Sequence, residues 1–327
     1  MTYLQPSILW LRCAVALVVV LSTPLAGALD LQGHRGARGL APENSLASFE
    51  VALKHGVTTL ELDIAITRDG VLVIHHDLTL NPDITRDALG RWLDKPSAPI
   101  HTLSWAELQT FDVGRLKPGS RYASNYPDQQ PIDGTRIPRL ADLFDMVKRG
   151  GHDSVRFAIE TKINPLLPDS TLPPERFADA VVAEVRKAGM QQRAQIISFD
   201  WRTLAHVQRI APEVSTVYVT AQQRWLDNIG ADRNETSAWT AGLRYSDHGS
   251  VPKMIKAAGG KFWSVYFGDL SATKVKEAQA LGLKVLVWTL NDAATMHRML
   301  DLGIDGLITD RPDIAREVLR ERRIEPR

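Results

Sequence analysis

The sequence predicts an α/β fold of the TIM (β/α)8 barrel type, and three observations lead to this prediction. Short apolar runs with the composition of β-strands alternate with amphipathic helical segments along the chain. One of nine such runs follows its neighbour too closely for a parallel crossover, so eight strands remain, most of them followed by a helix. Eight strand–helix units fit a chain of 327 residues.

The predicted elements follow in chain order. The barrel strands are short apolar runs, expected at residues 29–32, 58–66, 155–159, 195–198, 214–219, 261–265, 284–288 and 306–308. A first helix is expected after Asn44 or Ser45, its N-cap candidates, and Gly56 ends it. The later helices show apolar side chains at helical spacing and are expected at residues 175–188, 201–210, 251–258, 272–281, 293–302 and 313–322.

The ninth apolar run, residues 71–75, is expected to form an antiparallel arm on the second strand. Only the segment 67–70 separates it from that strand, and this segment contains an Asp-Gly pair, a strong hairpin signal. Folding the arm back places His76 across from Leu62 or Asp63.

A long segment over residues 81–139 does not fit a barrel connection. It is rich in Pro, Asp and Gly and contains one helical pattern, at residues 105–111. Because a loop of this length in a compact domain is usually functional or a small subdomain, we expect an insertion that hangs over the mouth of the barrel and shapes substrate choice. The alternative is a solvated excursion.

The first 28 residues have the pattern of a secretory signal peptide. Arg12 precedes an unbroken apolar run over residues 13–21, and Ala26-Gly27-Ala28 offers a cleavage site after Ala28. The alternative is an uncleaved membrane anchor, but about nine strongly apolar residues are far fewer than the roughly twenty that span a bilayer. We therefore expect export, to the periplasm or the medium, and one barrel domain over residues 29–327.

Composition restricts the partners of the exported chain. Its 39 Lys and Arg residues against 38 Asp and Glu residues give a net charge of +1, so no overall field attracts nucleic acid or a membrane surface. Cys13 is the only cysteine and lies within the signal segment, which excludes a disulfide or a thiolate metal site after cleavage. No lipidation box accompanies the cleavage site, so no stable membrane anchor is expected. The sequence predicts no oligomeric state.

Two carboxylates on the second strand point to a metal site. Glu61 and Asp63 are two residues apart and share one face of the strand. Their neighbours Leu60, Leu62 and Ile64 must face the helices, so the carboxylates face the barrel interior. A pair of buried carboxylates is costly there unless a cation offsets its charge.

A third carboxylate completes the predicted ligand set. Glu160 ends the strand over 155–159, and Lys162 shares its face. Three carboxylates without a cysteine suit a hard ion, Ca²⁺ or Mg²⁺, rather than zinc.

The end of the first strand offers groups for phosphate chemistry. His34 occupies the position where catalytic residues of barrels concentrate, although a lone histidine there is more often structural. Its neighbour Arg35 can bind two oxygens of a phosphate with one guanidinium. Gly33, Gly36 and Gly39 allow a close approach of the backbone to a ligand.

The hairpin arm ends in two adjacent histidines, of which only one can face the cleft. Parity with Asp63 across the hairpin favours His76, and His75 is expected to be structural. Trp288 ends another strand and is a candidate apolar wall of the site, with core packing as the alternative. Two histidines, three carboxylates and an arginine in one cleft suit metal-assisted cleavage of a phosphate ester.

A family resemblance extends over residues 34–312. The chain is similar to the glycerophosphodiester phosphodiesterases in motifs that occur in family order: His34-Arg35-Gly36, Pro42-Glu43-Asn44-Ser45, Ser48-Phe49, Ala52, Glu61-Leu62-Asp63, Asp69-Gly70, His76-Asp77, Ile159-Glu160-Thr161-Lys162, Ser198-Phe199, Trp288-Thr289-Leu290-Asn291 and Ile308-Thr309-Asp310-Arg311-Pro312. Two positions depart from the pattern: Ser45 replaces a threonine, and residues 80–83 replace an arginine-bearing stretch. The second departure leaves the substrate contacts near the insertion open.

The resemblance implies a TIM barrel, one divalent cation, and hydrolysis of glycerophosphodiesters to sn-glycerol 3-phosphate and an alcohol. The roles that it implies are acid and base for His34 and His76, phosphate binding for Arg35 and Lys162, and metal binding for Glu61, Asp63 and Glu160. It also implies attack by the glycerol 2-hydroxyl through a cyclic phosphate, with one histidine taking the proton and the other protonating the leaving alcohol. The alternatives are a lysophospholipid or phosphoinositide headgroup as substrate, and a noncatalytic phosphodiester-binding protein. Loss of a histidine would mark the last, and both histidines are present.

Overall fold

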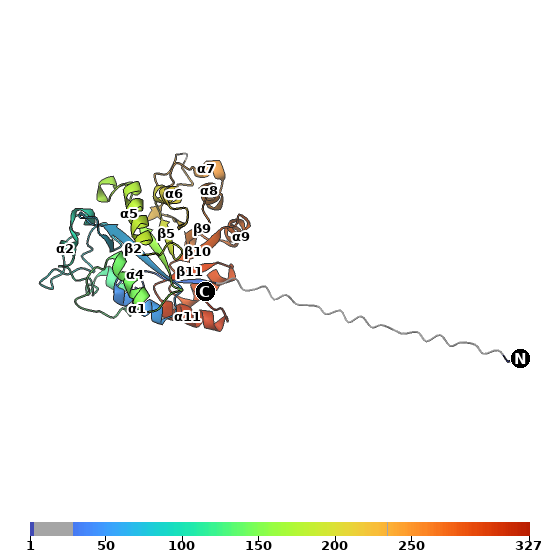
Figure 1. The fold of residues 1–327 in the computed structure, drawn as a ribbon, viewed down its shortest axis with the longest axis horizontal. Helices are drawn as coiled ribbons and strands as arrows, with labels where there is room; N and C mark the ends of the chain where they lie inside the picture. Colours follow the sequence, from blue (N-terminus) through green and yellow to red (C-terminus); the bar gives the residue numbers. More distant parts are fainter. Residues whose placement is uncertain (3–28, 234) are drawn as a thin grey trace.

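The computed structural model describes residues 1–2, 29–233 and 235–327. Eight parallel strands form a barrel that closes because the first strand pairs with both the last and the second, and helices surround it (Figure 1). The barrel strands are β1 (Asp30–Gly33), β2 (Thr59–Ile66), β4 (Arg156–Thr161), β5 (Ala194–Ser198), β6 (Ser215–Thr220), β9 (Phe262–Tyr266), β10 (Lys284–Trp288) and β11 (Gly306–Thr309). The predicted barrel is confirmed, and no strand bound differs from its predicted position by more than two residues.

Each barrel strand is followed, directly or after a long loop, by a helix of the outer ring. These helices are α1 (Leu46–Lys54), α4 (Leu140–Arg149), α5 (Pro174–Lys187), α6 (Trp201–Ile210), α8 (Val251–Ala257), α9 (Ala272–Ala280), α10 (Ala293–Asp301) and α11 (Pro312–Glu321). Shorter elements are α2 (Trp105–Leu108), α3 (Arg121–Ser124), α7 (Tyr245–His248), and the strands β7 (Gln222–Gln223) and β8 (Leu226–Asp227).

Helix α4 was missing from the predicted elements. Its buried residues Leu140, Leu143, Phe144 and Val147 have helical spacing, so the signal was present in the sequence. It begins directly after the segment rich in Pro, Asp and Gly, which hid its start. With α4 in place, the second strand also has its helix, and all eight units are complete.

The hydrophobic core has two parts around the barrel wall. The larger part lies between strands and helices and includes Leu60, Leu62 and Ile64 of β2. A smaller cluster fills the interior, with Ala158, Ile197, Val217, Val219, Leu286 and Ile308 as its buried members. Because β2 turns its leucines and Ile64 outward, its alternate residues face the interior, as predicted.

The hairpin arm carries the insertion. Strand β3 (Leu72–Ile74) pairs antiparallel with the end of β2, with Ile64 opposite Ile74. One face of the arm is covered by a separate apolar cluster whose members are Ala65, Val73, Leu80, Ile100, Leu108, Val113 and Ile137. Residues 81–139 are therefore a packed subdomain rather than a solvated excursion. This subdomain, which contains α2, forms the left edge of the molecule in Figure 1.

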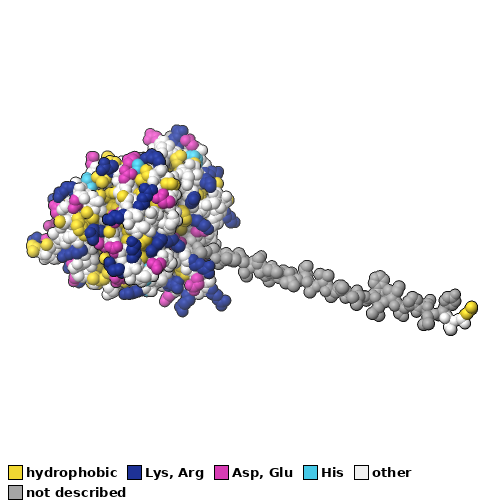
Figure 2. Space-filling view, viewed as in Figure 1, with side chains coloured by type: hydrophobic (Ala, Val, Ile, Leu, Met, Phe, Trp, Pro, Cys, Tyr) yellow, Lys and Arg dark blue, Asp and Glu magenta, His cyan; other side chains and the backbone are white. Residues whose placement is uncertain are grey.

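The surface mixes both charge signs. On the face in Figure 2, basic and acidic side chains are interspersed, in keeping with the net charge of +1. Within the described part of the chain, no helix combines the length and apolar character needed to cross a membrane. The predicted signal segment falls almost wholly on residues 3–28, outside the described residues.

Candidate active site

A cavity of about 640 Å³ opens at the carboxyl ends of the barrel strands. Seven of the eight predicted site residues line it: His34, Arg35, Glu61, His76, Glu160, Lys162 and Trp288. The eighth, Asp63, is buried beside them and contacts Arg35 and Lys162. Because parallel strands of a barrel end at the same rim, residues distant in sequence meet there.

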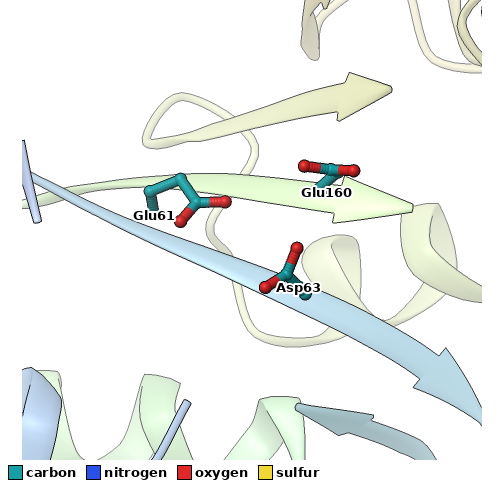
Figure 3. Close-up of side chains that lie close together, drawn as sticks. All are labelled: Glu61, Asp63 and Glu160. Atoms are coloured by element: carbon teal, nitrogen blue, oxygen red, sulfur yellow. The ribbon is translucent and has the colours of Figure 1, made fainter. Parts of the chain in front are cut away.

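The three predicted metal ligands converge. Asp63 on β2 is level with Glu160 on β4, and Glu61 lies two residues before Asp63 on the same face. One carboxylate oxygen from each lies within 4.8 Å of the others, and Figure 3 shows the three carboxylates turned toward one space above the two strands. All three side chains are buried.

The charges around these carboxylates fit a hard cation. Burial and repulsion from Asp63 and Glu160 raise the pKa of Glu61 well above its ordinary value. Burial also raises the pKa of Glu160, although Lys162 Nζ donates to Glu160 Oε1 at 2.6 Å. Three buried carboxylates are only partly neutralised by the cationic side chains, so a divalent ion with oxygen ligands would relieve the remaining repulsion.

Asp63 is the most strongly held of the three carboxylates. Asn44 Nδ2 donates to Asp63 Oδ2 at 3.0 Å, and the cations Arg35 and Lys162 lie at 3.2 and 3.5 Å. Burial opposes its ionisation, but the charges on His76, Arg35 and Lys162 outweigh burial and hold the pKa of Asp63 below its usual range. Asp63 therefore stays a carboxylate, as a metal ligand must.

His34 is oriented by a carboxylate from the far end of the chain. Its Nδ1 lies 2.6 Å from Asp310 Oδ1, and Arg38 donates to both oxygens of Asp310 at 2.9 and 3.1 Å. Because the pKa of Asp310 is lowered, chiefly by Arg38 and His34 against its burial, the carboxylate accepts and His34 Nδ1 carries the proton. In the neutral imidazole, His34 Nε2, which lies 3.9 Å from Glu61, therefore carries no proton.

His76, which also lines the cavity, has a matching arrangement. Its Nδ1 lies 2.6 Å from Asp77 Oδ1, and Asn81 donates to the other oxygen of Asp77 at 3.0 Å. Burial, followed by the charges of Arg35 and Lys162, lowers the pKa of His76 to about 4. Both histidines therefore have a carboxylate on Nδ1, the arrangement that fixes the tautomer of a catalytic imidazole.

His76 lines the cavity as predicted, but the strand parity from which it was predicted is wrong. The register places His75, not His76, level with Asp63, and His75 N–H donates to Asp63 O at 2.9 Å. Strand β3 ends at Ile74 and the chain bends at His76, which turns this side chain into the cavity. His75 is buried, and its Nε2 lies 3.3 Å from the carbonyl of Thr79.

Arg35 has a constrained backbone and side chain. Its φ of 50° is in the left-handed region, which costs a non-glycine residue on the order of 1 kcal/mol or more. Two hydrogen bonds offset this cost: Arg35 N–H donates to Glu61 Oε2 at 2.8 Å, and Asn44 N–H donates to Arg35 O at 3.0 Å. Nη1 donates to Glu43 at 2.8 Å, whereas Nε faces Asp63 without the alignment of a hydrogen bond.

Part of the cavity wall is aromatic. Phe199 and Trp225 each meet Trp288 edge to face, with ring centroids 5.5 and 6.1 Å apart. Trp225 is 58% exposed at the rim, as is Leu166 at 67%. None of residues 81–139 lines the cavity, so the expectation that the insertion hangs over the mouth is wrong. The connection between β6 and α8, which carries Trp225, occupies that position instead.

Sequence reasoning did not assign roles to several of these residues. Asp310 lies in a motif quoted for the family resemblance, but its contact with His34 joins residues 276 apart. No local sequence pattern marks Arg38 or Trp225 as part of the site. Asn44 was an N-cap candidate, whereas Ser45 caps α1 by accepting from Ser48 N–H, and Asn44 bonds Asp63.

Comparison with known proteins agrees with this geometry. The model of the Glycerophosphoryl diester phosphodiesterase family matches residues 34–314. A glycerophosphodiester phosphodiesterase of Bacillus subtilis is 28% identical over 290 residues, 87% of this chain and 84% of that protein. Another, from Caldanaerobacter subterraneus, is 25% identical over 288 residues, 88% of this chain and 96% of that protein.

Two solved structures are similar to the chain. A crystal structure from Silicibacter pomeroyi, assigned to the glycerophosphoryl diester phosphodiesterases, is 33% identical with a TM-score of 0.81, covering 92% of this chain and 96% of that one. A phosphodiesterase of Oleispira antarctica, in complex with its product sn-glycerol 3-phosphate, is 22% identical with a TM-score of 0.65, covering 90% and 97%. The second likeness is one of fold. The chain belongs to the glycerophosphoryl diester phosphodiesterase family, and is thus a phosphoric diester hydrolase.

Proposed function

We propose that this protein is a metal-dependent glycerophosphodiester phosphodiesterase that releases sn-glycerol 3-phosphate and an alcohol. One observation carries the proposal: two histidine–carboxylate pairs, three converging carboxylates and the cations Arg35 and Lys162 line a single cavity or lie directly behind its wall. Family membership supports it, and so does the product found in the Oleispira antarctica relative.

The histidines supply the proton transfers. One histidine enters the step with Nε2 unprotonated and takes the proton of the glycerol 2-hydroxyl as that oxygen attacks phosphorus. The other enters as the imidazolium and gives its Nε2 proton to the leaving alcohol. A five-membered cyclic phosphate results, and water opens it with the two roles reversed. Asp310 and Asp77 keep each imidazole in the tautomer with Nδ1–H bonded, so that Nε2 serves the reaction.

Arg35 and Lys162 bind the phosphate. Both line the cavity beside the carboxylates, so their charges lie where negative charge on the phosphoryl oxygens develops. Glu61, Asp63 and Glu160 would hold one Ca²⁺ or Mg²⁺. The ion would supply Lewis-acid polarisation of the phosphate and the attacking hydroxyl.

The test is release of sn-glycerol 3-phosphate from a panel of glycerophosphodiesters, with and without chelator. Hydrolysis should stop when excess chelator removes the metal, and either Ca²⁺ or Mg²⁺ should restore it. Full activity of the metal-free protein would contradict the role proposed for a cation. Hydrolysis of other phosphodiesters, but of no glycerophosphodiester, would contradict the proposed substrate.

One further substrate class has support from the cavity. Its aromatic side, with Phe199, Trp225 and Trp288, and the exposed Leu166 at the rim offer apolar contact that a small polar alcohol does not use. A lysophospholipid would place its phosphate at the carboxylate side and its chain along this wall. Parallel assays of lysophosphatidylcholine and glycerophosphocholine distinguish the two, since Trp225→Ala should weaken only the first.

We also propose that the chain is exported after cleavage behind Ala28. Support comes from the apolar segment and its Ala-Gly-Ala end, and from Leu29, which is already tied into the fold because Arg327 N–H donates to its carbonyl at 3.0 Å. Mass spectrometry of the mature protein should find Leu29 as its first residue. An intact Met1 in the exported fraction would contradict cleavage.

A further inference from the structure

Part of the insertion contacts the catalytic loop from behind. Residues 121–130 lie against the connection between β1 and α1. Gln129 Nε2 donates to the carbonyl of Arg38 at 2.7 Å, and Gln130 N–H donates to the carbonyl of Leu40 at 2.9 Å. These two bonds hold the segment against the loop without placing any of it in the cavity.

Tyr126 supports the hydrogen-bond chain that ends at His34. The guanidinium carbon of Arg38 lies 4.6 Å from the centroid of the Tyr126 ring. The same guanidinium donates to both oxygens of Asp310, and Asp310 accepts from His34 Nδ1. The ring of Tyr126 therefore supports the plane of Arg38. Arg38 sets the direction of the Asp310 carboxylate together with Asn291, whose Nδ2 donates to Asp310 Oδ2 at 2.7 Å.

Tyr122 supports a second chain, which ends at Arg35. Its hydroxyl donates to Glu43 Oε2, and the other oxygen of Glu43 accepts from Arg35 Nη1 at 2.8 Å. The same hydroxyl accepts from Arg38 Nη1 only at 3.4 Å, so its shorter bond is the one to Glu43. Burial and the negative charge of Glu43 raise the pKa of Tyr122 well above its ordinary value, so the phenol keeps the proton that it donates. The direction of the Arg35 guanidinium in the cavity therefore depends on Glu43, and that of Glu43 on Tyr122.

We propose that Tyr122 and Tyr126 are positioning residues of the active site, Tyr122 for Arg35 and Tyr126 for His34. The inference rests on the proposed function and assigns neither tyrosine a contact with substrate. The two rings also pack on each other, with centroids 5.3 Å apart. If the two tyrosines were purely structural, substituting either one would lower kcat and raise KM together. If they position two different groups, one substitution should change mainly KM and the other mainly kcat.

The first variant is Tyr122→Phe, which keeps the ring and removes the hydroxyl. It should raise KM about tenfold with little change in kcat, because a hydrogen bond to a charged group is lost from the phosphate-binding chain. The second is Tyr126→Leu, which should lower kcat about tenfold with little change in KM, because Arg38 loses a desolvated aromatic contact. Tyr126→Phe should restore kcat, since the ring face alone supports Arg38.

A matched control comes from the same insertion. Arg86 lies over the ring of Trp92 at 5.7 Å, and neither residue lines the cavity. Trp92→Leu removes a contact of the same kind and should leave both constants unchanged. In the Asp310→Asn background, Tyr126→Leu should cause no further loss of kcat, since both act through one chain. A full additional tenfold loss would overturn the assignment.

A spectroscopic measurement tests the same chain without turnover. In protein labelled with ¹⁵N-histidine, the His34 Nδ1–H resonance is assigned by its loss in His34→Gln. It should be retained in Tyr126→Phe and lost or shifted in Tyr126→Leu. An unchanged resonance in Tyr126→Leu overturns the positioning role. If the wild type hydrolysed no glycerophosphodiester, the proposed function would fail while this measurement still decided the role of Tyr126.

Discussion

Two adjacent histidines at the end of β3 have different environments, although they are chemically identical. His76 lines the cavity with Asp77 on its Nδ1, whereas His75 is buried against the carbonyl of Thr79. We expect His76→Ala to lower kcat about 10²–10⁴-fold, because a general acid or base is lost. His75→Ala should lower stability with little effect on kcat, because it leaves a buried gap.

Steady-state kinetics on both variants, each first checked for folding by circular dichroism, decides between them. An inactive His75→Ala protein beside a nearly normal His76→Ala protein would show that the bend after Ile74 has been misassigned.

The charge of Asp63 gives a second prediction at the residue scale. Asp63→Asn removes one negative charge at nearly constant shape, and an oxygen remains to accept from Asn44. The cation concentration needed for half-maximal activity should rise, because a hard ion prefers a charged carboxylate. Titration calorimetry with Ca²⁺ and Mg²⁺ should show the same weakening without substrate. Equal affinity in both proteins would remove Asp63 from the ligand set.

At the scale of elements, the connection between β1 and α1 depends on a close approach at Gly36. Its φ is +84°, and a Cβ there would lie 2.5 Å from Ser48 Oγ and 2.7 Å from the Ser48 carbonyl carbon. Gly70, in the turn of the hairpin arm, has a similar φ of +80°, but a Cβ at this position would have no heavy atom within 4 Å. Comparing alanine substitutions at the two glycines therefore separates the cost of the left-handed backbone from the cost of steric contact.

Gly70→Ala should cost about 1 kcal/mol of unfolding free energy, the penalty of the left-handed conformation alone. Gly36→Ala should cost more than about 2 kcal/mol, because the loop must also move away from α1. It should lower activity too, since His34 and Arg35 precede Gly36 directly. Urea unfolding and a rate assay on both variants test this, and equal losses of stability would contradict it.

At the scale of the whole molecule, Asp310 links the last strand to the first through Arg38 and His34. Burial opposes its charge, but Arg38 and His34 outweigh burial and lower the pKa of Asp310. The unfolded chain binds this proton near pH 4, whereas the folded protein does so only at lower pH. The stabilisation is therefore present above about pH 4 and is lost as the pH falls below it.

Urea unfolding across a series of acid pH values should show this loss in the wild type. Asp310→Asn should be less stable at neutral pH, because Arg38 stays buried without its partner. Its free energy of unfolding should nevertheless fall less steeply below about pH 4, because one titrating group is gone. Parallel curves for the two proteins would contradict the assignment.

The amino-acid sequence by itself determined the barrel and the ligand face of β2. Alternation along a strand is local, so the outward leucines placed Glu61 and Asp63 inside before any contact was known. Glu160 joined them because the carboxyl ends of parallel strands share one rim. The hairpin arm followed from the Asp-Gly turn, which is local as well.

Only the tertiary structure decided which partners complete the site. The contact between His34 and Asp310 exists because β1 pairs with β11 when the barrel closes, with Gly33 opposite Thr309. The turn of His76 into the cavity and the place of Tyr126 behind Arg38 likewise depend on how the arm and the insertion pack. Local periodicity sets the face of a residue within its own element, whereas contacts between distant segments form only when the chain closes on itself.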